Sequence, residues 1–120
     1  MFHKANINSL NLKDICAHGG DGLIKFARLT DKRTVSGAVN FIDVAIIPPQ
    51  VSIGSHTHQQ TEEEFYLVLE GEGTMTQNNN EFTVRAGDLI RNPPGGTHQL
   101  RNTSKENLRI FVFEVSVANL

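Results

Sequence analysis

Three histidines and a run of carboxylates are the residues of this sequence that could do chemistry. His56 and His58 are one residue apart, the run Glu62 to Glu64 follows, and His98 lies further along the chain. Residues two apart in a strand face the same side, so His56 and His58 can point into one interior. A buried carboxylate is costly unless it is paired or binds a metal. The pattern indicates a metal site built from the two histidines, a carboxylate of the run and His98.

Neither the H-x-H pair nor the glutamate run is sufficient alone to predict a metal site. An H-x-H pair often marks a polar strand face, and three consecutive glutamates often form a solvated charge run. Glu64 shares its strand parity with Tyr66 and Val68, which is unusual for a plain core and favours a functional carboxylate. Tyr66 is a candidate to line the pocket and donate a hydrogen bond; the alternative is a core tyrosine. Spacing alone leaves a metal site and a polar surface as open alternatives.

The expected donor set defines the class of ion. Imidazole nitrogens with one carboxylate oxygen suit a divalent transition metal, namely Fe, Mn, Ni, Co, Cu or Zn. Four protein ligands leave positions on a five- or six-coordinate metal for water, dioxygen or a substrate oxygen. Histidine must be neutral to bind, so acid should weaken the site. Asn102 and Thr97 are candidates to anchor the second ring nitrogens, because they lie near His98 in sequence.

Short, apolar, β-prone runs must position these residues. Turn residues separate the runs, and the three asparagines at 78–80 suit a hairpin. The runs are residues 23–29, 39–47, 51–57, 64–69, 73–77, 81–84, 89–90, 98–102 and 108–117. With no long helical pattern, the sequence predicts an all-β sandwich or barrel in a single domain. We expect a lead-in segment at 1–21, with a short helix or a lid strand, and a barrel domain at 22–120. The phenylalanines expected in the core are Phe65, Phe82, Phe111 and Phe113.

Composition and charge restrict the classes of partner. The 120 residues are 38% hydrophobic, which suits one core, and the net charge is −2. Lys and Arg are scattered rather than clustered, which argues against nucleic acid. No apolar run approaches the roughly 20 residues of a membrane helix. The first residues lack a secretory pattern and Cys16 is the single cysteine, so we expect a cytoplasmic protein. His18, among glycines, is either a further ligand or exposed loop polarity.

Two motifs of this sequence resemble those of the cupin superfamily. The second family motif is Gly, five residues, Pro, one residue, Gly, two residues, His, three residues, Asn. Gly87, Pro93, Gly95, His98 and Asn102 match every one of these spacings. The match is specific, because five residues of defined type recur at fixed distances.

The first family motif is matched less completely. It reads Gly, five residues, H-x-H, three or four residues, Glu, six residues, Gly. His56, His58, Glu64 and Gly71 fit it, including the gap from Glu64 to Gly71. The leading glycine is replaced by Gln50, which suggests a different turn before the strand.

The second departure concerns the carboxylate. The gap from His58 to Glu64 is one residue longer than the pattern, which leaves Glu63, or else Glu62, as a rival ligand. Glu64 is preferred because its distance to Gly71 agrees with the family.

The resemblance implies a cupin-type double-stranded β-helix, or jelly-roll barrel, of two sheets. It also implies that His56, His58, Glu64 and His98 hold the metal. The family includes dioxygenases, isomerases, decarboxylases and lyases, so we expect a metal-dependent enzyme acting on a small organic molecule. The alternatives are a non-catalytic metal- or ligand-binding sensor barrel, and a barrel whose metal is structural or absent. We further expect a homodimer, since exposed strand edges and apolar sheet faces often pair.

Overall fold

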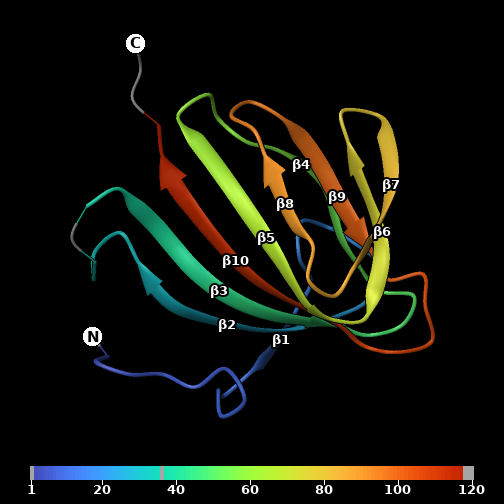
Figure 1. Ribbon diagram of the computed structural model, residues 1–120, viewed down its shortest axis with the longest axis horizontal. Coiled ribbons are helices and arrows are strands. Elements are labelled where there is room, and N and C mark those ends of the chain that lie inside the picture. The colour runs from blue at the N-terminus through green and yellow to red at the C-terminus, as the bar shows by residue number, and fades with distance from the viewer. Residues whose placement is uncertain (1, 36, 118–120) are drawn as a thin grey trace.

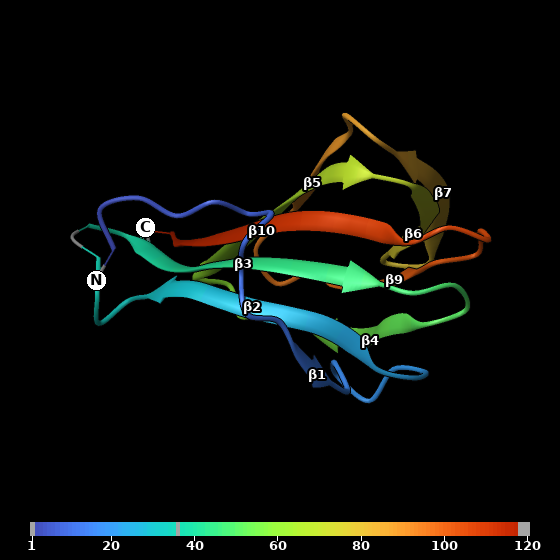
Figure 2. The ribbon, with the colours of Figure 1, turned by 90° about the horizontal axis from the view of Figure 1, so that it is seen from below.

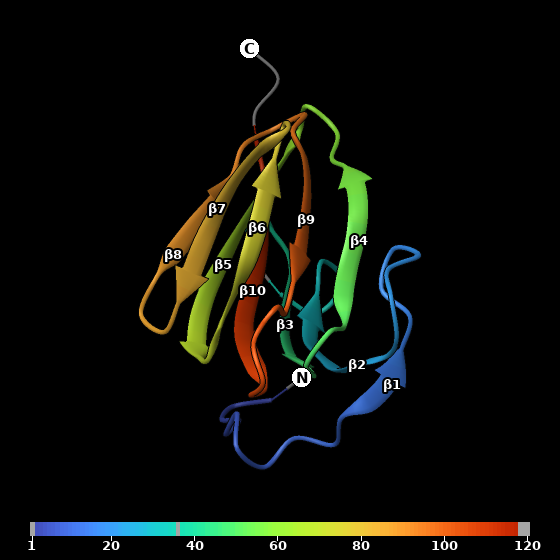
Figure 3. The same ribbon diagram turned by 90° about the vertical axis from the view of Figure 1, so that its right-hand side faces the viewer.

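Two antiparallel β-sheets make up the protein (Figures 1 and 3). The computed structural model describes residues 2–35 and 37–117, and every regular element in this part is a strand. The strands are β1 (Lys13–Ile15), β2 (Ile24–Asp31), β3 (Val39–Ile47), β4 (Ser52–Thr57), β5 (Glu62–Glu70), β6 (Glu72–Gln77), β7 (Asn80–Arg85), β8 (Leu89–Asn92), β9 (Thr97–Arg101) and β10 (Leu108–Ser116). The all-β prediction is confirmed. Across the described ranges, nothing has the length and apolar character of a membrane-spanning helix.

The two sheets differ in size and in the strands they join. The six-stranded sheet has the order β1-β2-β3-β10-β5-β8, and the four-stranded sheet has the order β4-β9-β6-β7. The β6–β7 hairpin turns at Asn78 and Asn79, whose φ values of 46° and 71° are those of a two-residue hairpin turn that asparagine tolerates. The predicted hairpin at the asparagines is therefore present.

The core lies between the sheets and follows strand alternation. Along β10, Leu108, Ile110 and Val112 are buried, and the residues between them are partly exposed. Met75 of β6 and Leu100 of β9 belong to the same buried cluster from the opposite sheet. Each such side chain contributes roughly 1.5–3 kcal/mol when it leaves water. This burial fixes the face of each strand on which a polar side chain meets the interior.

The prediction that four phenylalanines fill the core is wrong. Phe65, Phe111 and Phe113 have the opposite parity to the buried residues of β5 and β10, so they lie on the outer face of the six-stranded sheet. Phe65 and Phe113 stack there with ring centroids 4.9 Å apart. Phe82 on β7 is 38% exposed. Alternation identifies residues that share a face, but does not say which face is interior.

The lead-in segment contributes a strand and a loop to the fold. β1 pairs with β2 at the edge of the six-stranded sheet (Figure 2). The following loop packs on β4, where the Gly54 N–H donates to the Ala17 carbonyl at 2.9 Å. A Cβ on Gly54 would lie 2.2 Å from the His18 carbonyl oxygen, so only glycine allows this approach. The contact places His18 beside the residues that the sequence singles out.

Candidate metal centre

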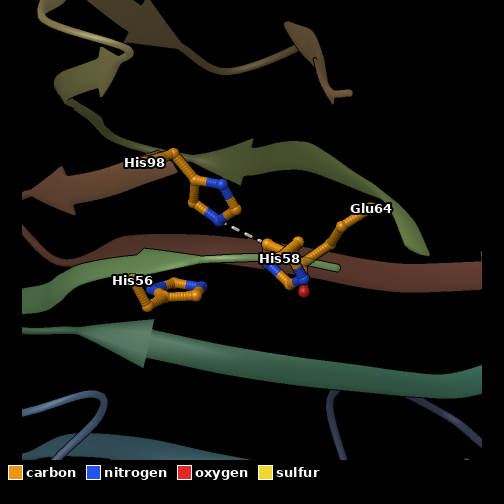
Figure 4. A group of neighbouring side chains, drawn as sticks. All are labelled: His56, His58, Glu64 and His98. Carbon is orange, nitrogen blue, oxygen red and sulfur yellow. Dashed lines mark ion pairs between the residues drawn. The ribbon is translucent and has the colours of Figure 1, made fainter. Parts of the chain in front are cut away.

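The pairing of β4 with β9 brings the histidines together. His56 lies directly opposite His98 in this antiparallel pair, and their ring centroids are 4.3 Å apart. His58 follows β4, where its N–H donates to the Gly96 carbonyl at 3.0 Å. Its ring centroid lies 5.0 Å from that of His56 and 4.8 Å from that of His98. Figure 4 shows the three rings gathered in the interior.

A β-bulge in β4 aims His56 at this cluster. Ile53 pairs with Leu100 and His56 pairs with His98, so β4 holds one extra residue between the two pairs. Strict alternation would put Ile53 and His56 on opposite faces, and the bulge lets both face the interior. The Nδ1 atom of His56 lies 2.8 Å from the Gly54 carbonyl oxygen. An Nδ1–H donated to this carbonyl leaves Nε2 with a free lone pair.

Glu64 supplies a carboxylate from the other sheet. Its Oε1 atom lies 3.1 Å from His98 Nε2 and 3.3 Å from His58 Nε2, and the residue is 5% exposed. Glu63 has the opposite parity and pairs with Arg91, with 2.6 Å between Oε2 and Nε. Glu62 Oε1 accepts the Gln59 N–H at 2.8 Å. Of the three glutamates, Glu64 is the one whose carboxylate lies between the histidine rings.

These four side chains fit a divalent metal ion. One donor atom from each of His56, His58, Glu64 and His98 lies within 4.8 Å of the others. His58 Nε2 and Glu64 Oε1 are buried without a hydrogen-bond partner among the described residues. Leaving such atoms unsatisfied is costly, and a cation between them would bind the Glu64 oxygen and, once His58 has lost its proton, Nε2 as well. Three nitrogens and one oxygen suit the first-row metals expected from the sequence.

The pKa values of the residues in this cluster are shifted in different directions. Burial lowers the pKa of His56 to about 4, although the hydrogen bond with the Gly54 carbonyl opposes the shift. Contacts of the His58 ring with Glu114 and then with Glu64 raise its pKa to about 10. Burial acts to raise the pKa of Glu64, but contacts with His58 and His98 outweigh it and lower that pKa to about 2. Near neutral pH, the Glu64 carboxylate therefore faces a protonated His58 and a neutral His56.

Two further residues adjoin the cluster: Glu114, which was not identified from the sequence, and His18, which the sequence left open between a ligand and loop polarity. Glu114 of β10 is buried, and its Oε1 atom lies 3.1 Å from His58 Nδ1. Its shared parity with Ile110 and Val112 is visible in the sequence, but parity does not say that this face of β10 is interior. His18 stacks on His56 with ring centroids 3.5 Å apart and planes within 8°. His18 is exposed, as expected for a polar residue in a loop. A lone histidine among glycines does not predict from the sequence that its ring stacks on His56.

Tyr66 belongs to both the core and the edge of the cluster. It is 3% exposed, and its hydroxyl oxygen lies 3.3 Å from His98 Nε2. Burial, together with the nearby Glu64 carboxylate, raises the pKa of Tyr66 well above its usual value. The hydroxyl therefore stays protonated and can donate a hydrogen bond near the donor atoms.

Asn102 and Thr97 do not anchor the histidine rings, contrary to expectation. The Asn102 Nδ2 donates to the Ile47 carbonyl at 2.8 Å and to the Glu106 carbonyl at 2.7 Å. Its Oδ1 accepts from the N–H of Ser104 at 2.9 Å. Thr97 Oγ1 lies 2.7 Å from Thr57 Oγ1. Asn102 thus fastens the β9–β10 turn to the end of β3, while Glu114 and the Gly54 carbonyl contact the second ring nitrogens.

Comparison with known proteins identifies the class to which this fold and site belong. The model of the cupin domain family matches residues 43–114, which include the last five residues of β3, all of β4 to β9 and most of β10. The chain is a member of this cupin family, and the resemblance noted in its sequence is confirmed.

Particular relatives agree with this assignment. An oxalate-binding protein of Thermotoga maritima is 31% identical over 93 residues, covering 78% of this chain and 76% of that protein. An uncharacterised protein of Methanocaldococcus jannaschii is 41% identical over 67 residues, covering 56% of this chain and 53% of the relative. A solved Thermotoga maritima structure, described as a predicted oxalate decarboxylase, has a TM-score of 0.88 at 26% identity, covering 93% of this chain and 97% of that one. The cupin domain of Schizosaccharomyces pombe Cnp3 has a TM-score of 0.78 at 18% identity, covering 95% of this chain and 74% of that one. This similarity supports the fold alone.

Proposed function

We propose that this protein is a metal-dependent enzyme that acts on a small organic molecule. The metal, a divalent ion of Fe, Mn, Ni, Co, Cu or Zn, is held by His56, His58, Glu64 and His98. The observation that carries this proposal is the convergence of four donor atoms within 4.8 Å, two of them buried without a hydrogen bond among the described residues. When bound, such an ion supplies Lewis-acid chemistry to a substrate oxygen at an open position.

The protein's own groups prepare the site for this role. Glu114 Oε1 lies 3.1 Å from His58 Nδ1 and the Gly54 carbonyl oxygen lies 2.8 Å from His56 Nδ1, so these contacts orient Nε2 of each ring toward the other donor atoms. The protonated hydroxyl of Tyr66 can donate to a substrate oxygen that gains charge during the reaction. Dioxygenase, isomerase and lyase chemistry are all compatible with this arrangement. The similarity to a predicted oxalate decarboxylase favours a lyase reaction at a carboxylate.

A second candidate is a binding protein without turnover. The oxalate-binding protein of Thermotoga maritima, 31% identical to this chain, favours it. Both candidates need the same metal site, and they differ in whether a bound acid is converted. Incubation of the metal-loaded protein with a panel of diols, thiols, oxo acids and oxalate, with oxygen uptake and proton NMR as readouts, separates them.

A pair of matched variants tests the metal site. Glu64→Gln removes the charge between the histidines, whereas Glu63→Gln makes the same change one residue away, where the side chain faces Arg91. We expect elemental analysis to find about one first-row metal per chain in the wild type and in Glu63→Gln. In a metal titration, the affinity of Glu64→Gln should be at least about tenfold lower. Loss of metal from Glu63→Gln alone, or no metal in the wild type, would overturn the proposal.

We also propose that the two sheets form a cupin-type jelly-roll barrel. The strand orders β3-β10-β5-β8 and β4-β9-β6-β7 support it, because they are those of an eight-stranded jelly roll of two Greek keys. The superposition with a TM-score of 0.88 supports the same assignment.

A homodimer is proposed through the outer face of the six-stranded sheet. Phe65, Leu67, Phe111 and Phe113 are only partly buried on this face, and an apolar patch of this kind favours pairing with a second copy. Phe113→Glu should give the mass of one chain in sedimentation, whereas wild type and Phe82→Glu, which changes an exposed phenylalanine on β7, should give the mass of two chains. A single-chain mass for the wild type would exclude this dimer.

A further inference from the structure

An apolar cavity lies beside the four donor side chains, between the two sheets. Its volume is about 290 Å³, and Glu64 and Tyr66 form the part of its wall that adjoins the metal-binding residues. Side chains of β2, β3 and β10 form most of the remainder, and among them are Ile24, Phe26, Ala45, Ile110 and Val112.

A second, polar cavity meets the first at the same place. It has a volume of about 340 Å³ and is lined by His56, His58, Glu62 and Glu114, among others. Glu64 lines both cavities, together with residues of β2 and β3. Of the four donor side chains, Glu64 therefore lies at the junction between the polar cavity and the apolar one. A molecule with one polar end and one apolar end matches this arrangement.

The size of the apolar cavity limits the molecule that fills it. A dry cavity of about 150 Å³ in another protein takes up one benzene molecule. The cavity here, at about 290 Å³, is about twice as large. Oxalate is no larger than benzene and carries no apolar group, so it would leave most of the apolar wall without contacts. A ligand with a phenyl or branched aliphatic group would fill this space.

The charges on the cavity wall limit the ligand to one acidic group. Arg28 is the only Lys or Arg among the described residues that line the apolar cavity. Its guanidinium is already bound to Asp43 by two hydrogen bonds of 2.8 and 3.0 Å, and it lies 4.3 Å from the centre of the Phe41 ring. Asp43 and Glu64 contribute two carboxylates to the same wall. A second carboxylate placed in the apolar cavity would meet like charges with no free cation to pair with it.

We propose that the substrate is a 2-hydroxy or 2-oxo monocarboxylic acid with an apolar substituent. This inference rests on the proposed function, because the two neighbouring oxygens of the acid would bind a metal held by the four protein ligands. The substituent fills the apolar cavity between β2, β3 and β10. The site is therefore built for an acid larger and less charged than oxalate.

Calorimetric titration of the Mn²⁺-loaded protein with three acids tests this inference. Glycolate carries the head group alone, mandelate adds a phenyl ring to it, and oxalate replaces the alcohol with a second carboxylate. Because burying the ring is worth about 2 kcal/mol, the preferred enantiomer of mandelate should bind at least about 30-fold more tightly than glycolate. It should also bind more tightly than oxalate.

Variants that fill the cavity supply the second measurement. Ala45 is 2% exposed and faces the cavity, so Ala45→Leu should weaken mandelate binding about tenfold and leave glycolate binding unchanged. Val112→Leu makes a smaller change in the same wall and should act in the same direction. Ala27→Leu is the matched control, because Ala27 has the opposite parity on β2 and does not line the cavity.

The outcomes separate this inference from the function on which it rests. Tighter binding of oxalate than of mandelate, or unchanged mandelate affinity in both cavity variants, overturns the inference while the measured metal content leaves the metal site intact. Failure of the wild type to retain Mn²⁺ before any acid is added overturns the proposed function, and this inference with it.

Discussion

Binding of a metal above pH 7.5 should release about one proton per chain, and we expect this proton to come from His58. Glu114 Oε1 lies 3.1 Å from its Nδ1 and Glu64 Oε1 lies 3.3 Å from its Nε2. These carboxylates raise the pKa of His58 to about 10, whereas an ordinary histidine is neutral above pH 7.5. A metal can bind Nε2 only after the proton there has left.

The size of the effect follows from the distance between the pH and this pKa. Removing the His58 proton at pH 7.5 costs about 3 kcal/mol, because each pH unit below the pKa corresponds to about 1.4 kcal/mol. The apparent association constant should therefore rise about tenfold from pH 7.5 to pH 8.5.

The assay is calorimetric titration of metal-free protein with Mn²⁺ in two buffers that differ in their heat of ionisation. The difference in apparent enthalpy gives the number of protons released. Glu114→Gln removes the carboxylate that raises the pKa of His58 most, so proton release should be smaller than in the wild type. Glu63→Gln, whose side chain faces Arg91, should behave as the wild type. No proton release in the wild type, with an affinity that does not change with pH, would refute this reasoning.

Three further predictions concern the metal-free protein. Its unfolding free energy should be highest near pH 6.5. The pKa of His56 is lowered to about 4 by folding, so stability is lost as the pH falls from 6.5 to 4. The pKa of His58 is raised to about 10, so its contribution to stability is complete below pH 6.5 and is lost as the pH rises through 10. Urea titrations from pH 4 to 10 would check this, and a flat profile would contradict it. Gly54→Ala should lower stability by about 2 kcal/mol or more in a urea titration, because its Cβ would lie 2.2 Å from the His18 carbonyl oxygen. Gly19→Ala, with open space around it and a φ of +65°, should cost only about 1 kcal/mol, and equal losses would show that the close approach is unimportant. Gln50→Gly should raise the melting temperature by a few degrees, because Gln50 has a φ of +66°, a conformation that costs a side-chain residue about 1 kcal/mol; a lower melting temperature would count against this strain.

Motif spacing and strand periodicity were sufficient for the class of fold and for the set of candidate ligands. The H-x-H pair and the distances among Gly87, Pro93, His98 and Asn102 are local properties of the chain, and they do not depend on knowing which strands pair. The substitution of Gln50 for the expected glycine was also visible. The structure adds that Gln50 adopts the left-handed conformation that glycine favours, so the turn retains a glycine-type geometry despite the substitution.

The sequence did not predict which face of each strand is buried. Phe65 and Tyr66 are neighbouring aromatic residues in one strand, and only the packing of the two sheets turns Tyr66 inward and Phe65 outward. The same packing places Glu64 beside the histidines and turns Glu63 toward Arg91. Parity separates adjacent residues without naming the buried one, because both faces of these strands carry apolar side chains.

By itself, the sequence determined which residue types are available and how far apart they stand along the chain. It therefore determined the β class, the family and the candidate donors. Only the tertiary structure decided that a bulge in β4 turns His56 inward, that Glu114 reaches His58 from β10, and that an apolar cavity adjoins Glu64. The reason is physical: these features depend on contacts between strands far apart in sequence, and strand register, rather than local preference, sets their distances.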